Sequence, residues 1–248
     1  MYFNDISIIV YGVAAIIGLI MGAAIDWANC RLPEYKKVFS LEFFKQERKN
    51  VKPNYILMLV TAILYVALIY IVGINKTFIG NLNLIKYLIL VPMLLSAFVI
   101  DYKLQIIPNR LNLSMFQIGL LIAFLSGIYD ISITINMLLG MFAGMGIFLA
   151  ITLIGGLIYG KEAMGFGDVK LMGALGLFFG LQNTIIITLV SFLIGAIISI
   201  ILLATKVKKT DEYMPFGPFI VIATFISMFV PFGYIKIALM EIFTLGLY

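Results

Sequence analysis

The sequence offers few residue types for catalysis. It contains no His and a single Cys, Cys30, which excludes a Ser–His dyad, an H-E-x-x-H zinc site, a four-thiolate zinc site and an internal disulfide. Among the twelve acidic residues, Asp26, Asp101 and Asp168 differ from the others because each borders an apolar run. An acidic group costs at least ~2.5 kcal/mol at the centre of a membrane-spanning helix, so it usually faces a protein interior or a water-filled pocket. Acid–base chemistry by carboxylates is therefore the leading hypothesis.

Asp101 and Asp168 form the most informative pair. Asp101 ends an apolar run in A-F-V-I-D-Y-K-L, and Asp168 opens another in M-G-F-G-D-V-K-L. The charge distribution described below predicts that both lie at the same membrane boundary, where two carboxylates of a compact bundle can meet across a cleft. Two such groups close together share one proton and titrate as a unit. The ionised member can then take a proton from water while the protonated member polarises a peptide carbonyl. Together these two actions would hydrolyse a peptide bond.

Each of these residues also has a purely structural explanation. Asp168 follows G-F-G and would be a good helix N-cap, and Asp101 would be a solvated end of a span. Gly165 and Gly167 either let the backbone of an extended peptide approach the acids or form a tight turn into a helix. Two proline segments either start helices or shape a cleft wall, and their residues are Pro108, Asn109, Pro215, Gly217 and Pro218.

The composition indicates which elements position these acids. Apolar residues make up 63% of the 248 residues, with a further 22 Gly, and only 12% are charged, whereas soluble domains are roughly 45–50% apolar with Gly included and ~25% charged. We therefore expect an integral membrane protein, all-α, with residues 1–248 forming one polytopic bundle of six to eight helices and no strand of consequence. The expected spans are 6–25, 55–74, 84–100, 112–128, 135–159, 171–181, 184–204 and 215–231, followed by a weaker stretch over 234–248.

Positive charge predicts the orientation of the bundle. The basic loop 26–54 and every second loop after it hold fourteen of the 17 Lys and Arg, so the positive-inside rule places these loops in the cytoplasm and the N-terminus outside. The remaining loops hold Lys76, Lys86 and Lys236. The first run lacks the positive flank of a signal peptide, and we expect it to be retained. The net charge of +5 then reflects topology and the lipid bilayer, and no nucleic-acid partner is expected.

Four segments together resemble the bacterial type IV prepilin peptidases, the leader peptidase/N-methyltransferase family. They occur in the order found in that family, and the G-F-G-D block is the most specific of them. The segments are G-A-A-I-D-W-A-N-C-R-L-P (22–33), D-Y-K-L-Q-I-I-P-N (101–109), E-A-M-G-F-G-D-V-K-L-M-G-A-L-G (162–176) and M-P-F-G-P-F (214–219).

The resemblance implies a polytopic aspartic protease of the cytoplasmic membrane face. Such enzymes remove the basic leader from prepilins and pseudopilins, typically between Gly and Phe, and many then methylate the new N-terminus with S-adenosylmethionine. Asp101 and Asp168 correspond to the catalytic pair. The residues that correspond to supporting motif positions are Gly165, Gly167, Lys170, Pro108 and Asn109.

Two departures from the family pattern limit what can be carried over. Many members bind zinc through two C-x-x-C pairs in the first cytoplasmic loop, whereas loop 26–54 has only Cys30 and zinc is not expected. The first segment has Ala23 and Asp26 where the family pattern has Ser and Asn, which leaves methylation undecided. The residues assigned to a substrate or methylation region are Asp26, Asn29, Arg31, Pro215 and Gly217.

Two other functions fit the same acids. A presenilin-like G-x-G-D protease that cuts within the bilayer shares the G-F-G-D block, although its Y-D order and its P-A-L segment are missing here. An ion-coupled transporter would use Asp101 and Asp168 as proton sites, and the lack of an inverted repeat counts against it. The position of a cleaved bond relative to the membrane, or uptake without cleavage, would separate these functions.

Overall fold

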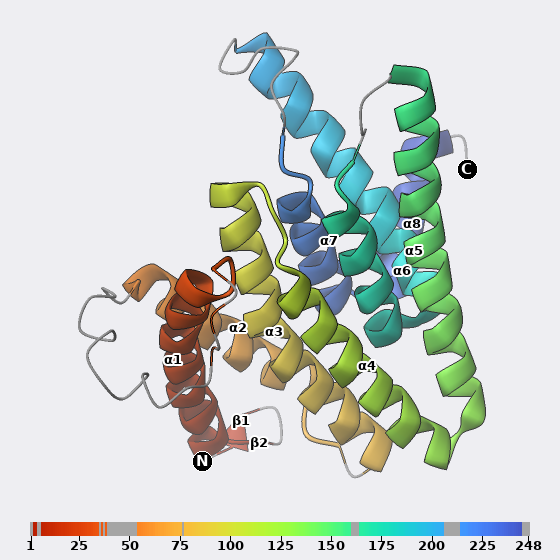
Figure 1. The fold of residues 1–248 in the computed structure, drawn as a ribbon. Helices are drawn as coiled ribbons and strands as arrows, with labels where there is room; N and C mark the ends of the chain where they lie inside the picture. Colours follow the sequence, from red (N-terminus) through yellow and green to blue (C-terminus); the bar gives the residue numbers. More distant parts are fainter. Residues whose placement is uncertain are drawn as a thin grey trace. The chain divides into compact units, whose positions relative to one another are not determined.

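The computed structural model describes residues 2–3, 6–34, 36, 38, 54–75, 77–159, 164–205 and 214–244. Most of the predicted basic loop 26–54 lies outside these residues. Within them the chain forms eight α-helices and a pair of two-residue strands, β1 (Tyr2–Phe3) and β2 (Ile6–Ser7) (Figure 1). The helices are α1 (Ile8–Arg31), α2 (Tyr55–Val72), α3 (Phe78–Leu104), α4 (Asn109–Tyr129), α5 (Ile131–Tyr159), α6 (Phe166–Ala204), α7 (Gly217–Phe229) and α8 (Phe232–Thr244).

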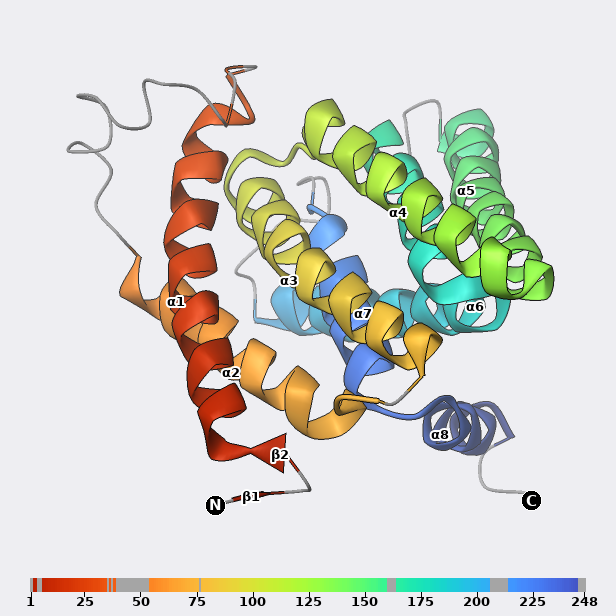
Figure 2. The same ribbon diagram turned by 90° about the horizontal axis from the view of Figure 1, so that it is seen from below.

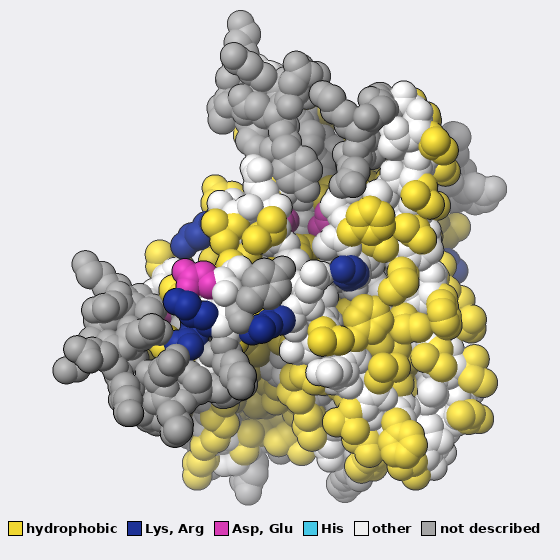
Figure 3. Space-filling view, in the orientation of Figure 1, with side chains coloured by type: hydrophobic (Ala, Val, Ile, Leu, Met, Phe, Trp, Pro, Cys, Tyr) yellow, Lys and Arg dark blue, Asp and Glu magenta, His cyan; other side chains and the backbone are white. Residues whose placement is uncertain are grey.

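The prediction of an all-α polytopic membrane protein is confirmed. In the described part of the chain, α1 to α6 are each long and apolar enough to cross a membrane, and Figure 3 shows hydrophobic side chains over the face formed by α4 and α5. The predicted span 215–231 is a shorter helix of 13 residues, Gly217–Phe229. At 1.5 Å per residue it is about 20 Å long, less than the ~30 Å of a hydrocarbon core.

The contacts group the chain into two compact units. The first comprises Met1–Ile100 with Pro108–Leu111, and the second comprises Asp101–Ile107 with Asn112–Tyr248. Helix α3 runs from the first unit into the second, so its last turn, which carries Asp101, belongs to the second unit. Both acids of the predicted pair therefore lie in one unit.

In the first unit, α1 and α2 lie side by side (Figure 2). A Cβ atom added at Gly18 would be 2.5 Å from the Cα atom of Ala62, and one added at Gly22 would be 2.5 Å from the Cα atom of Met58. This G-x-x-x-G spacing lets the two backbones approach closely, as is common between membrane helices. Lys86, which we predicted in a loop, lies instead within α3 because that helix begins at Phe78.

In the second unit, α5 packs closely against α6. A Cβ atom added at Gly140 would be 2.6 Å from the carbonyl oxygen of Gly176, and one added at Gly144 would be 2.6 Å from that of Met172. These contacts set an antiparallel register in which residues of α5 further along the chain face earlier residues of α6. Extended along the two helices, this register places Asp168 at the level of Phe148.

Helix α6 is broken at Gly180. This glycine has φ 72° and ψ 176°, a conformation that residues with a Cβ atom adopt rarely. The main-chain N–H of Leu181 is satisfied by the side-chain oxygen of Asn136, at 3.1 Å. The predicted runs 171–181 and 184–204 are thus the two segments of α6, and Figure 1 shows them running in different directions.

Helix α8 replaces the weak stretch predicted over 234–248. Its buried Ile235 and Leu239 form a small hydrophobic cluster with Ile186 of α6. Lys236, predicted in a loop, lies within this helix. Residues 245–248 lie outside the described residues.

Candidate active site

Asp101 lies in the last turn of α3, three residues before the end of the helix. Its main-chain carbonyl accepts a hydrogen bond from the N–H of Gln105 at 2.8 Å. Gln105 has φ 56°, the one positive φ of a non-glycine residue in the described chain, and this left-handed conformation ends the helix. Pro108 then directly precedes α4, as predicted, so the acid is held at a defined helix end.

Asp168 lies in the first turn of α6. The N-cap of this helix is Gly165, whose carbonyl accepts the main-chain N–H of Asp168 at 3.0 Å. The explanation of Asp168 as an N-cap residue is therefore wrong, because the helix begins at Phe166, two residues before it. The side chain of Asp168 is 4% exposed. No residue in the described part of the chain donates a hydrogen bond to its Oδ1 atom.

The carboxylate of Asp101 is fixed by the start of α7. It is 3% exposed, and its Oδ2 atom accepts the main-chain N–H of Gly217 at 2.9 Å. A Cβ atom at position 217 would lie 2.5 Å from the same Oδ2 atom, so only glycine allows this approach. Pro218 occupies the first turn of α7, where its missing N–H costs nothing. The segment around Gly217 thus both starts a helix and forms a wall of the site.

Ile107 joins the two halves of the site. A Cβ atom added at Gly167 would lie 3.2 Å from the Cβ atom of Ile107, and one added at Gly217 would lie 3.2 Å from its Cδ1 atom. Gly167 precedes Asp168, and Gly217 holds Asp101. The two carboxylates also interact electrostatically. The structure therefore brings the predicted acids into one buried site, over 67 residues of sequence separation.

An aromatic cluster supports the start of α7. The ring of Phe216 lies 5.0 Å from that of Phe192, 6.0 Å from that of Phe148 and 5.7 Å from that of Phe219, measured between centroids. Gly195 leaves room for this cluster, since a Cβ atom there would be 3.1 Å from the Phe216 ring. Large rings in contact are costly to displace, so α5 and α6 fix the position of the Gly217 N–H.

Asn112 and Ile107 belong to the site but were missed by the sequence analysis. Asn112, in the first turn of α4, donates a hydrogen bond from Nδ2 to the carbonyl of Gly167 at 3.1 Å and is 2% exposed. A polar residue one turn after Pro108 in an apolar helix was the available signal. Ile107 carried none, because an isoleucine beside a membrane helix is ordinary.

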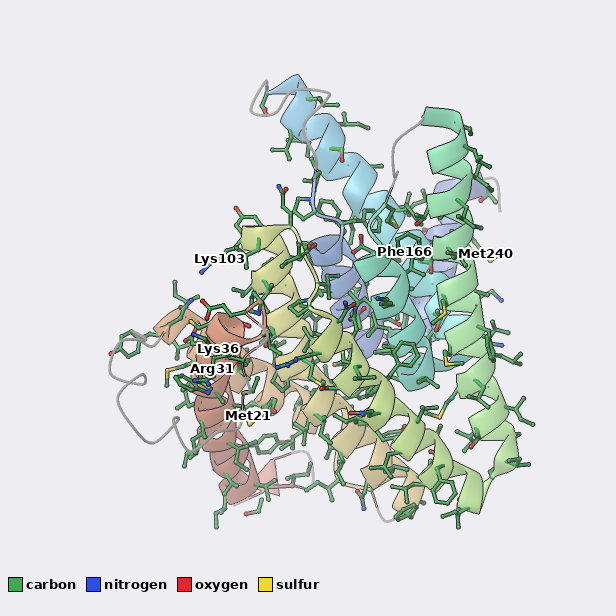
Figure 4. The ribbon with its side chains drawn as sticks, viewed as in Figure 1. Met21, Arg31, Lys36, Lys103, Phe166 and Met240 are labelled. Atoms are coloured by element: carbon green, nitrogen blue, oxygen red, sulfur yellow. The ribbon has the colours of Figure 1, made fainter. Side chains whose placement is uncertain are left out.

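The remaining predicted motif residues differ in their exposure. Lys170 is exposed on α6, Asn109 is exposed at the start of α4, and Pro108 and Pro215 are buried. Figure 4 shows Phe166 at the N-terminal end of α6 and Lys103 near the end of α3. Both are exposed.

The predicted substrate or methylation residues of α1 belong to the first unit. The carboxylate of Asp26 accepts the main-chain N–H of Asn54 at 2.7 Å, and the guanidinium of Arg31 lies 4.7 Å from the centre of the Trp27 ring. The polar side-chain atoms of Asn29 are buried, and none of the described residues hydrogen-bonds to them. Arg31 and Lys36 lie at the C-terminal end of α1 (Figure 4).

The segment that contains both acids is similar to a known protein family. Residues 88–200 match the model of the type IV leader peptidase family. The resemblance seen in the sequence is thereby confirmed for the segment that contains both acids, the G-F-G-D block and Asn112. Gly217 and the α1 residues lie outside the matched segment.

Curated relatives agree with the family match. The chain is 33% identical over 141 residues to a prepilin leader peptidase/N-methyltransferase of Aeromonas salmonicida, covering 57% of this chain and 47% of the relative. It is 33% identical over 152 residues to the protein of that name in Legionella pneumophila, covering 60% of this chain and 51% of the relative. The chain thus spans about half the length of the curated relatives it matches. No solved structure matches it.

The zinc site of two C-x-x-C pairs, which many members of the resembled family have, does not fit the residues of this chain. Structural zinc requires several thiolate or imidazole ligands, and the sequence has one Cys and no His. Within the described residues, no group of three acidic or Cys side chains is placed to hold a metal ion. Peptide-bond hydrolysis by a pair of acids needs only carboxylates and water.

Proposed function

We propose that this protein is an aspartic endopeptidase that removes the basic leader from prepilins or pseudopilins at the cytoplasmic face of the inner membrane. The observation that carries the proposal is the burial of Asp101 and Asp168 in one site, within the segment that matches the leader peptidase family. The charge asymmetry of the loops supports the orientation, with the N-terminus outside.

The proposed reaction needs one water and the two acids. One carboxylate takes a proton from the water as its oxygen attacks the scissile carbonyl carbon, and the other acid donates a hydrogen bond to the carbonyl oxygen. The tetrahedral intermediate then collapses, the C–N bond breaks, and the leaving amine takes up a proton. Both acids return to their starting states with one proton shared between them.

The hydrogen bonds of the site suggest how the roles are divided. Asp101 already accepts a main-chain N–H on Oδ2, which holds that carboxylate in one orientation. The Oδ1 atom of Asp168 is buried and accepts no bond from the described residues, as suits an acid that carries the shared proton. We therefore assign Asp101 as the base that activates water and Asp168 as the acid that polarises the carbonyl.

Methylation of the new N-terminus is a separate part of the proposal. The matched relatives are named prepilin leader peptidase/N-methyltransferase. In this chain methylation would use S-adenosylmethionine. The candidate residues are Asp26, Asn29 and Arg31 in the first unit and, as a separate set, Pro215 and Gly217 in the second. The proteolysis does not depend on it.

Mass spectrometry of a co-expressed prepilin tests both activities. The expected product begins at the residue after the basic leader, and its mass reports any added methyl group. Asp101→Asn and Asp168→Asn chains, shown to be folded in detergent, should leave the prepilin uncut. Cleavage retained in either variant would remove that residue from the mechanism.

The same experiment separates the rival functions. A cut inside the apolar segment of the substrate would instead indicate a protease acting within the bilayer. Proton-coupled uptake into proteoliposomes, without cleavage, would indicate a transporter.

A further inference from the structure

We propose that Asn112 is a substrate-binding residue, whose side-chain oxygen accepts a hydrogen bond from a main-chain N–H of the peptide being cleaved. The inference rests on the proposed peptidase function and extends it to a residue outside the acid pair and the glycine motif.

The first step is the orientation of the Asn112 side chain. The carbonyl oxygen of Gly167 can only accept a hydrogen bond, and it lies 3.1 Å from Nδ2 of Asn112. The NH2 group must therefore face Gly167, which settles which end of the amide is nitrogen. The oxygen, Oδ1, consequently faces the other way, and it too can only accept.

The second step is that this oxygen lacks a donor. Asn112 is 2% exposed, and Oδ1 is buried with no hydrogen-bond partner among the residues that the structure describes. Leaving a buried acceptor unsatisfied is destabilising. The unpartnered Oδ1 atom is therefore able to accept a hydrogen bond from a bound molecule.

The third step is location. Nδ2 and Oδ1 share one planar carboxamide, and Nδ2 is bonded to the carbonyl of the peptide group that joins Gly167 to Asp168. The open acceptor therefore lies beside the main chain that carries the proposed acid. The Oδ1 atom of Asp168 is likewise buried without a donor in the described chain.

The donor follows from the chemistry of the substrate. An extended peptide presents a main-chain N–H at every residue except proline, next to the carbonyl that the acids must reach. One such N–H bonded to Asn112 would fix the register of the peptide relative to Asp168. Binding of this kind orients the scissile bond without taking part in the proton transfers.

A double-substitution experiment tests the assignment. The substrates are synthetic peptides spanning a prepilin cleavage site, in which one amide at a time is replaced by an ester, the scissile bond excepted. Each ester removes one N–H and keeps the shape of the chain. Full-length wild type and Asn112→Leu in detergent are compared by kcat/KM for every peptide.

The expected result is coupling at one position. In the wild type, one ester lowers kcat/KM about tenfold, because it removes a bond of about 1.4 kcal/mol. Asn112→Leu removes that bond together with the bond to Gly167, so it should lower kcat/KM for the all-amide peptide at least about tenfold. In Asn112→Leu that ester should have less than about a twofold effect. Asn112→Thr, whose hydroxyl can donate to Gly167 or accept from the peptide, should recover part of the loss.

Controls distinguish binding from loss of structure. Ser126→Ala removes another buried polar group of α4 and should leave every kcat/KM value unchanged. If all esters have equal effects in wild type and Asn112→Leu, the donor is not a substrate N–H and the inference is wrong, although the peptidase function stands. If the wild type cleaves no prepilin peptide, the proposed function itself fails, and this inference with it.

Discussion

Two acids near helix ends make the same hydrogen bond in different surroundings. Asp26, in α1, accepts the main-chain N–H of Asn54 at 2.7 Å. Asp101, in α3, accepts that of Gly217 at 2.9 Å. In each case the donor stands next to the start of a later helix, α2 or α7. The bond at Asp26 is exposed, whereas the bond at Asp101 is buried.

The difference shows what makes a carboxylate available for chemistry. The bond at Asp26 links α1 to Asn54, the N-cap residue of α2. The Asn54 side chain caps α2 by accepting the N–H groups of Ile56 and Leu57. The bond at Asp101 places one carboxylate oxygen beside a second buried acid. The bond at Asp26 therefore stabilises the fold, whereas the bond at Asp101 orients a carboxylate. The difference is that Asp101 has a second buried acid, Asp168, beside it.

The largest expected effect separates the two acids directly. Asp101→Asn or Asp168→Asn should lower kcat at least about 100-fold, because general acid–base catalysis is lost. The double variant should be no worse than either single variant, since the pair acts as a unit. Asp26→Asn, measured on the same prepilin, should keep kcat within about twofold. An equal loss of kcat in Asp26→Asn would show that Asp26 and Asp101 do not differ in their importance for catalysis.

The next effect concerns the donor to Asp101. Gly217→Ala introduces a methyl group 2.5 Å from the Oδ2 atom, which must shift the carboxylate, and a misplacement of this size costs roughly 10–100-fold in kcat. Gly146→Ala, where nothing lies within 4 Å of the new Cβ atom, is the matched control. Equal kcat values for the two variants would show that the Gly217 contact does not orient Asp101.

A smaller effect is expected on stability at the other acid. Asp26→Ala removes the bond to Asn54 and should lower the free energy of unfolding by about 1 kcal/mol, without changing kcat/KM. Asp26→Asn keeps an acceptor oxygen and should recover most of this loss. Thermal unfolding in detergent, with cleavage assayed in parallel, measures both. A loss of activity with unchanged stability would contradict the structural role.

The smallest effect is expected at Asp130, an exposed acid between α4 and α5. Its Oδ1 atom accepts the hydroxyl and the main-chain N–H of Ser132 at the start of α5, and these bonds lower the pKa of the carboxyl below its usual value. A lowered pKa means that the stabilisation is present at neutral pH and is lost as the pH falls through that pKa. Asp130→Ala should therefore slightly lower the melting temperature at pH 7 but not in strong acid. A difference that is the same at both pH values would exclude this cause.

The sequence predicted the spans and the interruption of α6, but not the geometry of that interruption. Hydropathy and length decide whether a helix crosses a membrane, so α1 to α6 were foreseeable. The positive φ of Gly180 was not predicted, because it accompanies a hydrogen bond between the Leu181 N–H and Asn136, 45 residues earlier in the chain.

The acid pair was predicted because residue types alone distinguish it from the rest of the sequence. Carboxylates beside apolar runs are rare and the G-F-G-D block is specific, whereas Gly217 was named without its partner. No sequence pattern says that its N–H reaches Asp101. Asn112 was missed for the same reason, since an asparagine gains its meaning here only from the Gly167 carbonyl that it contacts.

The register of α5 against α6 determines how far Asp168 lies from the end of α5. Beyond the level of Phe148, α5 continues for about three turns, or about 17 Å, and its outward side chains there include the exposed Leu153, Ile154 and Leu157. The end of α6 is equally apolar, with Ile197 and Ile200 exposed. Such apolar surfaces suit contact with acyl chains. In the proposed peptidase, the water and the scissile bond would therefore have to reach a level about three turns short of the end of α5.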